Sequence, residues 1–486
     1  MGAERERPAR AFGRFVKSPR PPNLRQMPEV SAIVARARAA QREFGENARQ
    51  EDLDRASVAV GWALLKPENN RRLSQMAVAE TGLGNAADKE IKNRRKTLGL
   101  LRDIRGKKTA GIIREYDGIS EISRPVGVVA ALTPSTNPLA TPVNKTINAL
   151  KCGNAIVLAP PPKGAGVGSE LLALMRENLQ KIGAPPDIVQ MLLPPGKAAT
   201  AELAQLADLV VATGSQRNIK LAMASGTPSL GVGAGNVAVI IDESANVADA
   251  AAKIAASKTF DNATSCSSEN HLIIVSDVYD KMLAALQDAG GFLLDDSGKK
   301  QLAAKLWQDG ALNRELIARD IGVFVREAGL PAAAAKAKFV MAEEDGVGKE
   351  YPFSGEKLSL ALTLYRADNF AAAVCRVREL LEYQGAGHSV GIHTQSQSRP
   401  PELGLSLPTC RVIVNQAHCF ANGGSFDNAL PFSLSMGCGS WGKNQFGENL
   451  NYRHFRNITR VVRPIPPKEA DENTIFADYW NVAGRD

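Results

Sequence analysis

Residues 126–236 repeat one order, in which a short apolar run is followed by an amphipathic segment and then by another apolar run. The apolar runs are short enough for buried strands, and each ends at turn-forming residues: VGVVAALTP (126–134), NAIVLAP (154–160) and ADLVVATGS (207–215). The segments between them space apolar residues three or four apart, as helices do. Strands that alternate with helices predict a parallel, doubly wound sheet, so the predicted fold class is α/β.

A second unit of the same kind begins with the strand-like VAVIID at 237–242. A helical segment (247–260), a strand-like run (271–277) and two longer helical segments follow it, and VIVN at 412–415 precedes a Gly-rich stretch. A chain of 486 residues also exceeds what one core usually serves. We therefore predict two doubly wound parallel-sheet domains.

Residues 31–104 have helical periodicity, with Pro67 suited to the first turn of a helix and Gly82 to its end. An isolated alternating segment (111–125) and a late apolar strand (454–465) are expected to pair as a small β hairpin platform for a partner subunit. The predicted division is a disordered basic extension (1–30), a dinucleotide-binding domain including the oligomerisation strands near 111–124 (31–236), a catalytic domain (237–430), and a return to the first domain with an oligomerisation strand and tail (431–486).

The composition narrows the class of function. The net charge of +8 is spread along the chain and aromatic residues make up only 5%, so a base-stacking surface for nucleic acid is not expected. No apolar run reaches the roughly 18–20 residues that cross a bilayer, and the N-terminus lacks the apolar core of a secretory signal. The six cysteines form no C-x-x-C pair and have no zinc-ribbon spacing. We expect a cytoplasmic protein with free thiols, no metal site and no membrane partner.

One cysteine, Cys266, lies in SKTFDNATSCSSEN (257–270) among hydroxyl and amide side chains. A free cysteine is most often a small buried residue. Its neighbours would line an apolar site poorly, however, and a loop before a strand suits exposure, so a nucleophile is the competing interpretation. The residues around Cys266 do not decide between the two.

Two other loops could serve a cofactor or a reacting carbonyl group. Gly214 and Ser215 link a strand to a helix N-terminus, which can hold a pyrophosphate, although Ser215 could simply cap the helix. Asn137 lies between prolines just past a strand, where a fixed amide could donate to an oxyanion, although a turn-forming Asn-Pro is the alternative. GVGAGN (231–236) precedes its strand, which indicates a packed turn rather than a dinucleotide fingerprint.

In this order, the motifs resemble the aldehyde dehydrogenase superfamily from about residue 30 to 465. The resemblance is narrower to its acylating, coenzyme A-dependent branch, and within that branch to the acylating sulfoacetaldehyde dehydrogenases. The segments that carry it are the Asn137 loop, NAIVLAPPP, ATGS, LGVGAGN, SKTFDNATSCSSEN, GEKLSLAL, GAGHSVGIHT and LSMGCGSWGKN.

The resemblance implies a mechanism for these residues. The Cys266 thiolate would attack an aldehyde, with the oxyanion held by the Asn137 amide and the backbone N–H of Cys266. Hydride transfer to a nicotinamide would leave a thioester, which coenzyme A would then take up in ping-pong kinetics. Glu356 matches the carboxylate that holds the nicotinamide ribose. His388 matches a histidine that lies near the catalytic pocket in the acylating branch. A purely structural role for His388 is an equally good interpretation.

Two departures from other members refine the prediction. Hydrolytic members place a water-activating Glu before the glycine-rich turn, and the matching position is Gly231, which favours release to a thiol as acyl-CoA. NAD-preferring members often carry an acid after the second strand. Here LAPPPKG places Pro160 and Lys163 beside the cofactor, which favours NADP while leaving NAD possible; Arg217 is a second phosphate candidate.

The substrate prediction depends on the polar neighbours of the cysteine. Ser265 and Ser267, with His418 and Asn422 in a later loop, suggest a pocket for a polar tail, and a sulfonate such as that of sulfoacetaldehyde would suit it. A hydrolytic aldehyde dehydrogenase with another base, or a catalytically silent scaffold with this fold, are the competing functions. By family analogy the protein is a homodimer or homotetramer.

Overall fold

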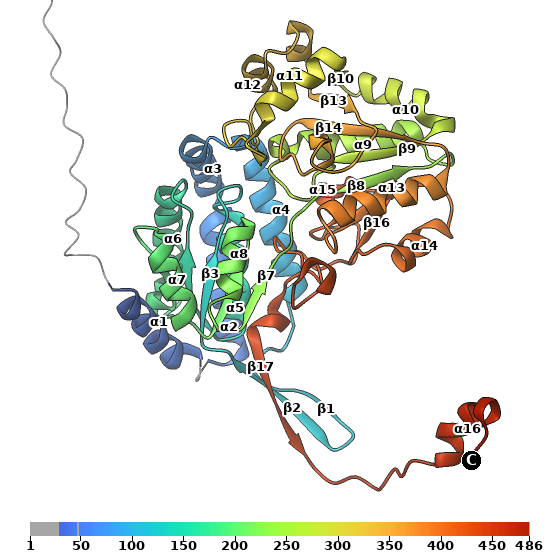
Figure 1. The fold of residues 1–486 in the computed structure, drawn as a ribbon. Coiled ribbons are helices and arrows are strands. Elements are labelled where there is room, and N and C mark those ends of the chain that lie inside the picture. Colours follow the sequence, from blue (N-terminus) through green and yellow to red (C-terminus); the bar gives the residue numbers. More distant parts are fainter. Residues whose placement is uncertain (1–28, 46–47, 486) are drawn as a thin grey trace, which may run out of the picture.

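The computed structural model describes residues 29–45 and 48–485 (Figure 1), so residues 1–28 of the predicted basic extension lie outside the described residues. The described residues contain two parallel sheets, one three-stranded antiparallel sheet and one two-stranded hairpin. The predicted α/β class and the two parallel sheets are confirmed.

The first sheet has five parallel strands in the order β5-β4-β3-β6-β7. Its strands are β3 (Val128–Leu132), β4 (Ala155–Ala159), β5 (Val189–Met191), β6 (Leu209–Ala212) and β7 (Ser229–Gly231). The chain winds outward from β3 to β5 and then returns to the other side of β3. The strand order therefore reverses between β3 and β6, and ligands of such sheets bind beyond the carboxyl ends of the strands at this point.

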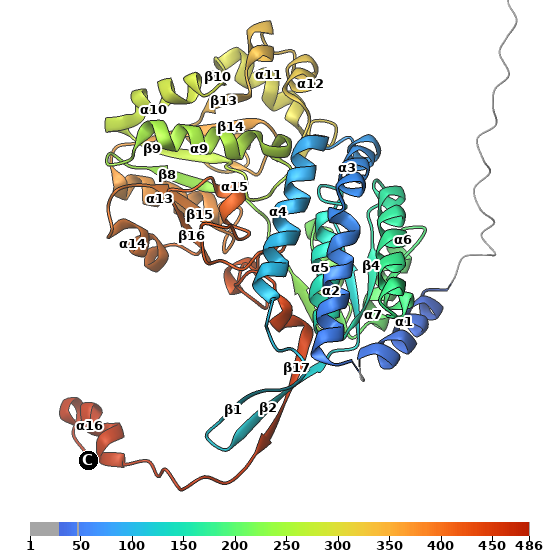
Figure 2. The same ribbon diagram turned by 180° about the vertical axis from the view of Figure 1, so that it is seen from behind.

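Helices cover both faces of this sheet. Helices α2 and α5 lie over the face seen in Figure 2, whereas α7 and α8 lie over the face seen in Figure 1. The helices of this part are α1 (Val30–Gly45), α2 (Gln50–Leu65), α3 (Pro67–Thr81), α4 (Ala86–Ile104), α5 (Ala140–Lys151), α6 (Ala165–Lys181), η2 (Pro186–Ile188), α7 (Lys197–Leu206) and α8 (Gln216–Met223). As predicted, Pro67 begins α3 and Gly82 ends it in the left-handed conformation.

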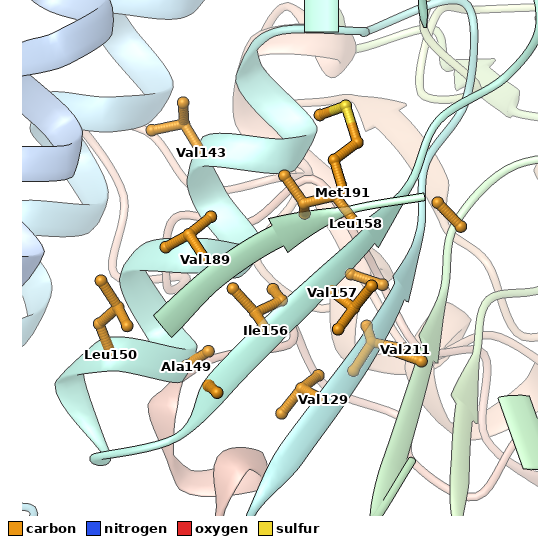
Figure 3. Packing of buried hydrophobic residues seen from close by; sticks show 14 of the residues in the cluster. Val129, Val143, Ala149, Leu150, Ile156, Val157, Leu158, Val189, Met191 and Val211 are labelled. Carbon is orange, nitrogen blue, oxygen red and sulfur yellow. The ribbon is translucent and has the colours of Figure 1, made fainter. Parts of the chain in front are cut away.

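The core of the first sheet is built from its all-buried strands and the helices packed on them (Figure 3). Val129, Ile156 and Val211 come from three adjacent strands. Residues from far along the chain complete this core, namely Phe432, Phe446, Leu450 and Phe455. The chain thus returns to the first sheet after passing through the second.

The second sheet has seven parallel strands in the order β10-β13-β14-β9-β8-β15-β16. Its strands are β8 (Ala238–Ile241), β9 (His271–Val275), β10 (Gly291–Leu293), β13 (Phe339–Glu343), β14 (Ala361–Ala367), β15 (Val390–His393) and β16 (Val412–Val414). Its helices are α9 (Val247–Thr259), η3 (Phe260–Ala263), α10 (Ser276–Asp288), α11 (Asp296–Leu306), α12 (Ile321–Ala328), η4 (Ala332–Lys336), η5 (Pro352–Ser354), α13 (Phe370–Tyr383), α14 (Arg399–Ser406) and α15 (His418–Ala421). A two-stranded hairpin, β11 (Trp307–Gln308) with β12 (Ala311–Leu312), lies between α11 and α12.

The small antiparallel sheet has the order β1-β2-β17, from β1 (Gly111–Tyr116), β2 (Ile119–Pro125) and β17 (Arg456–Val462). The predicted pairing of the two distant segments is therefore confirmed. The sheet projects from the body, and beyond it the chain leads to α16 (Glu472–Ala483), none of whose residues is buried (Figures 1 and 2). Two short 3₁₀ helices, η6 (Ser440–Gly442) and η7 (Tyr452–Phe455), precede β17.

The two parallel sheets present opposite edges to the loops that carry the predicted site. The loops after β3, β4 and β6 lie at the carboxyl edge of the first sheet, and those before β9, β14 and β15 lie at the amino edge of the second. Among residues 29–45 and 48–485, no helix is both long and apolar enough to span a membrane.

Candidate active site

Cys266 lies in the loop between η3 and β9, and the residue is half-buried. Burial, followed by the nearby charge of Glu356, raises the pKa of its thiol to about 12. The thiol is therefore protonated at neutral pH in this state. A nucleophilic role requires that the proton leave as the substrate or cofactor binds.

The glycine-rich turn before β8 packs directly on this cysteine. A Cβ atom placed on Gly235 would lie 2.8 Å from the Cβ of Cys266 and 2.8 Å from Oε1 of Glu356. Only glycine fits at this position without displacing the cysteine loop. The expected packed turn, rather than a dinucleotide fingerprint, is what the structure contains.

Gly231, which we matched to the water-activating Glu of hydrolytic enzymes, ends β7 and is buried. A Cβ atom there would lie 2.7 Å from Cγ2 of Ile219, so the residue faces a helix. Gly235, later in the same turn, is the glycine that packs against Cys266. Neither Gly231 nor Gly235 has a side chain that could take a proton from water.

Glu356 follows η5, and its carboxyl group lies, like Cys266, against Gly235 of the turn. Its Oε1 atom is buried and has no hydrogen-bond partner among the described residues. Burial raises the pKa of this carboxyl to about 8, although Lys357 and Lys258 act in the opposite direction. A buried, unpartnered carboxyl oxygen beside the predicted nucleophile is suited to bind a ligand hydroxyl or to accept a proton.

Asn137 lies in the loop after β3 and is half-buried. Its Oδ1 atom accepts a hydrogen bond from Nζ of Lys92, at 3.1 Å. The same ammonium donates to Oγ1 of Thr264, at 2.8 Å, two residues before Cys266. The structure thus joins the predicted oxyanion donor and the predicted nucleophile through one lysine of α4.

Apart from Glu356, the predicted cofactor residues lie along the carboxyl edge of the first sheet. Gly214 follows β6 with φ +140°, and a Cβ atom there would meet Pro134, which follows β3, at 3.5 Å. Ser215 caps α8, since its side chain accepts from the backbone N–H of Asn218. The capping role given above as the alternative is therefore present. Pro160 is buried at the end of β4, and Lys163 beyond it is exposed. These positions border the point where the strand order reverses.

The serines and histidine predicted to line a substrate pocket bond chiefly to each other. Nδ1 of His418 donates to the carbonyl of Ser267 at 3.0 Å, and Nδ2 of Asn422 donates to Oγ of Ser267 at 2.8 Å. Burial lowers the pKa of His418 to about 4, so the ring is neutral. Oγ of Ser265 accepts from the N–H of Ser267, and Ser265 is half-buried. These contacts brace the cysteine loop, which sequence alone did not indicate.

His388 is buried just before β15. Its Nδ1 atom bonds Oγ of Ser389 at 2.8 Å, while Nε2 has no partner among the described residues. Burial and the nearby Arg411 hold the pKa of the ring well below its usual range. Arg411 also donates to the His388 carbonyl from Nε and Nη2. This histidine therefore has both a structural anchor and one free ring nitrogen.

Sequence reasoning missed the part that α4 plays. Lys92 and Arg95 belong to DKEIKNRRK (88–96), a highly charged segment that is typical of a solvent-exposed helix face. Lys92 is nevertheless buried, and Arg95 is half-buried. The available signal was the three-residue spacing, which places both on one face, but only the fold shows that this face meets the cysteine loop. Within the described residues, no group of His, Cys, Asp or Glu side chains could hold a metal ion.

Comparison with known proteins gives concordant matches. Residues 23–292 match the aldehyde dehydrogenase family. The acylating sulfoacetaldehyde dehydrogenase of Cupriavidus necator is 56% identical over 94% of this chain and 93% of its own. The crystal structure of an acetylating aldehyde dehydrogenase from Geobacillus thermoglucosidasius is 37% identical, covers 91% of this chain and 98% of its own, and superposes with a TM-score of 0.87.

A third match is an engineered glycolyl-CoA reductase with bound NADP⁺, at 25% identity, 90% coverage of this chain, 97% of its own and a TM-score of 0.79. The resemblance to acylating members that the motifs indicated is therefore confirmed over nearly the whole length. The chain belongs to the aldehyde dehydrogenase family.

Proposed function

We propose that the protein oxidises an aldehyde to an acyl-CoA through a thioester on Cys266. The observation that carries this proposal is the similarity, over 94% of the chain, to an acylating relative. The thiolate of Cys266 adds to the carbonyl carbon, and the Asn137 amide and the N–H of Cys266 stabilise the oxyanion. A nicotinamide dinucleotide, when bound, would supply the acceptor for the hydride that leaves the carbonyl carbon. The sulfur of coenzyme A then takes the acyl group and restores the thiol.

In this proposal the first sheet and its helices bind the dinucleotide, and the second sheet carries the nucleophile. Gly214 and Ser215 lie at a helix N-terminus next to the end of β3, where a pyrophosphate is favourably placed. Glu356 holds the nicotinamide ribose. We propose NADP as the preferred dinucleotide, because the exposed Lys163 has no carboxylate partner among the described residues and Arg217 is also exposed.

A hydrolytic reaction is the second candidate, because one carboxyl group does lie beside the nucleophile. Glu356 has a free oxygen and a raised pKa of about 8, so it could accept a proton from water. The product would then be a free acid. The glycine-rich turn itself, GVGAGN, contains no acidic residue.

The decisive experiment is a product assay with NAD and NADP, each with and without coenzyme A. We expect NADPH and acyl-CoA to accumulate together when coenzyme A is present. Without coenzyme A, we expect NADPH formation to stop after the first turnover. Sulfoacetaldehyde, acetaldehyde and succinate semialdehyde serve as substrates. Sustained turnover to free acid without coenzyme A would support the hydrolytic candidate, and inactivity toward all three aldehydes would support a silent scaffold.

We propose sulfoacetaldehyde as the substrate, which agrees with the activity named for the relative. A cation near the site supports an anionic tail. The Arg95 guanidinium lies over the rings of Phe420 and Phe426, at 5.2 and 5.6 Å, and donates to Oγ of Ser425. Within the described residues it has no ion-pair partner. Phe420 in turn packs on Phe260 of η3, which precedes the cysteine loop, with ring centroids 4.6 Å apart.

Replacing Arg95 by Gln should lower kcat/KM for sulfoacetaldehyde by about 10- to 100-fold, because a charge-assisted hydrogen bond contributes about 1.5–3 kcal/mol. The rate with acetaldehyde, which has no charged tail, should change little. Steady-state kinetics with both aldehydes measure the ratio. Arg94→Gln, on the exposed side of the same helix, is the matched control. An equal loss with both substrates would rule out tail recognition by Arg95.

We further propose that the protein assembles as a homodimer or homotetramer through the small antiparallel sheet. Its β17 strand is an edge strand, and Val461 and Val462 are exposed on it. Light scattering of the full chain measures the assembly size.

A further inference from the structure

A buried ionic cluster joins α4 to the loop that carries Cys266. The Asp261 carboxylate is 0% exposed and pairs with Nζ of both Lys89 and Lys92, which are 3% and 6% exposed. Burial opposes the negative charge of Asp261, but Lys92 and Lys89 outweigh it and hold the pKa of this carboxyl below its usual value. Charges so deeply buried are costly unless paired, so the cluster is a fixed element of the site.

The same cluster holds a bent stretch of backbone just before the nucleophile. Asp261, Asn262 and Ala263 all have positive φ, at 49°, 52° and 57°, which is unfavourable for residues with a side chain. The Asp261 carboxylate accepts the N–H of Asn85 at 2.9 Å and Oγ1–H of Thr264 at 2.8 Å. These bonds fix the path by which the loop reaches Cys266.

Lys92 makes two contacts that Lys89 does not. Beyond its ion pair it donates to Oγ1 of Thr264 and to Oδ1 of Asn137. An ammonium group has only donors, so the atom it meets on Asn137 must be the oxygen. This leaves Nδ2 of Asn137 on the other side of the amide, and that nitrogen has no protein partner among the described residues.

We propose that Lys92 is a positioning residue for the oxyanion. By bonding Oδ1 of Asn137, it sets the amide so that Nδ2 donates to the oxygen that becomes negative when Cys266 adds to the aldehyde. By bonding Thr264, it keeps that amide in register with the cysteine loop. The inference depends on the proposed role of Asn137, and it adds the group that orients this residue.

A double-mutant cycle tests the inference. Asn137→Ala should slow the first-turnover formation of NADPH by about 10²- to 10³-fold, the usual loss for one oxyanion donor. Lys92→Met should slow it by about 10- to 100-fold, because the amide can then rotate. The double variant should be no slower than Asn137→Ala alone, since Lys92 acts through that amide. Multiplied losses in the double variant would overturn the inference.

Two controls separate positioning from a general structural effect. Alkylation of Cys266 by iodoacetamide forms no oxyanion, so its rate should be unchanged in Lys92→Met, and a slowed alkylation would indicate a displaced loop instead. Lys96→Met removes another α4 lysine, which donates to the carbonyls of Gly423 and Gly424, and should retain the wild-type rate. Lys92→Arg keeps a donor and should recover part of the lost rate.

The outcome is separable from that of the proposed function. A hydrolytic enzyme would also need the oxyanion donor, so the cycle is unaffected by whether coenzyme A or water releases the acyl group. If Asn137→Ala alone keeps the wild-type rate, the oxyanion role fails and the inference fails with it. If both single variants are slow and their effects multiply, the proposed chemistry stands and only the role of Lys92 is wrong.

Discussion

Cys266→Ser is expected to lower the rate of NADPH formation by at least about 10⁴-fold. A serine hydroxyl is a far weaker acid than a thiol, and the burial that raises the thiol pKa to about 12 opposes an alkoxide even more strongly. The replacement is close to isosteric, so the packing against Gly235 should be kept. Absorbance of the reduced dinucleotide measures the loss.

Cys375→Ser is the matched control, because Cys375 is an exposed free cysteine on α13 and should be dispensable. The wild type is incubated with aldehyde and NADP but no coenzyme A and then digested. Mass spectrometry should show one acyl group on the peptide that contains Cys266. A Cys266→Ser variant that retains more than about a tenth of the wild-type rate would show that another group forms the intermediate.

Asp261→Ala is expected to lower the free energy of unfolding by about 3–5 kcal/mol, because it leaves two buried lysines without their shared partner. The bent backbone at residues 261–263 also loses the carboxylate that holds it. Differential scanning calorimetry should show a fall of about 3–5 °C in the midpoint of thermal unfolding.

The control for this prediction is Asp249→Ala. Asp249 pairs with Lys253 on the surface of α9, and exposed pairs contribute only about 0–1 kcal/mol. If the two variants melt within about a degree of each other, the buried cluster contributes little to stability. Any effect of Asp261→Ala would then be expected on the catalytic rate and not on stability.

The alternation of apolar runs and helical segments was enough to predict both parallel sheets. Their central strands are short, buried on both faces and bounded by turns, so local pattern and tertiary environment agree. The pairing of residues 111–125 with a strand more than 300 residues later was also predicted, since both segments have strand patterns and lie outside the two alternating units.

The electrostatics of the site could not be predicted from the sequence. Lys92 finds its partner 169 residues further along the chain, and no local pattern separates a buried lysine from a solvated one. Ser267 and His418 are another example, since their bond spans 151 residues and makes them braces of the loop. The contact of Gly235 with Cys266 was not predicted either, because the path of a loop depends on what packs against it.

The return of the chain to the first core has a consequence for biosynthesis. Phe432, Phe446, Leu450 and Phe455 fill a core whose other members lie mostly in the first half of the sequence. A ribosome that has made residues 1–236 has therefore synthesised every strand of the first sheet but not the residues that complete its core. Part of the apolar core of this half therefore stays exposed while the whole second sheet is synthesised. Premature stop codons after residue 430 would spare every strand of both parallel sheets, yet leave the first core open.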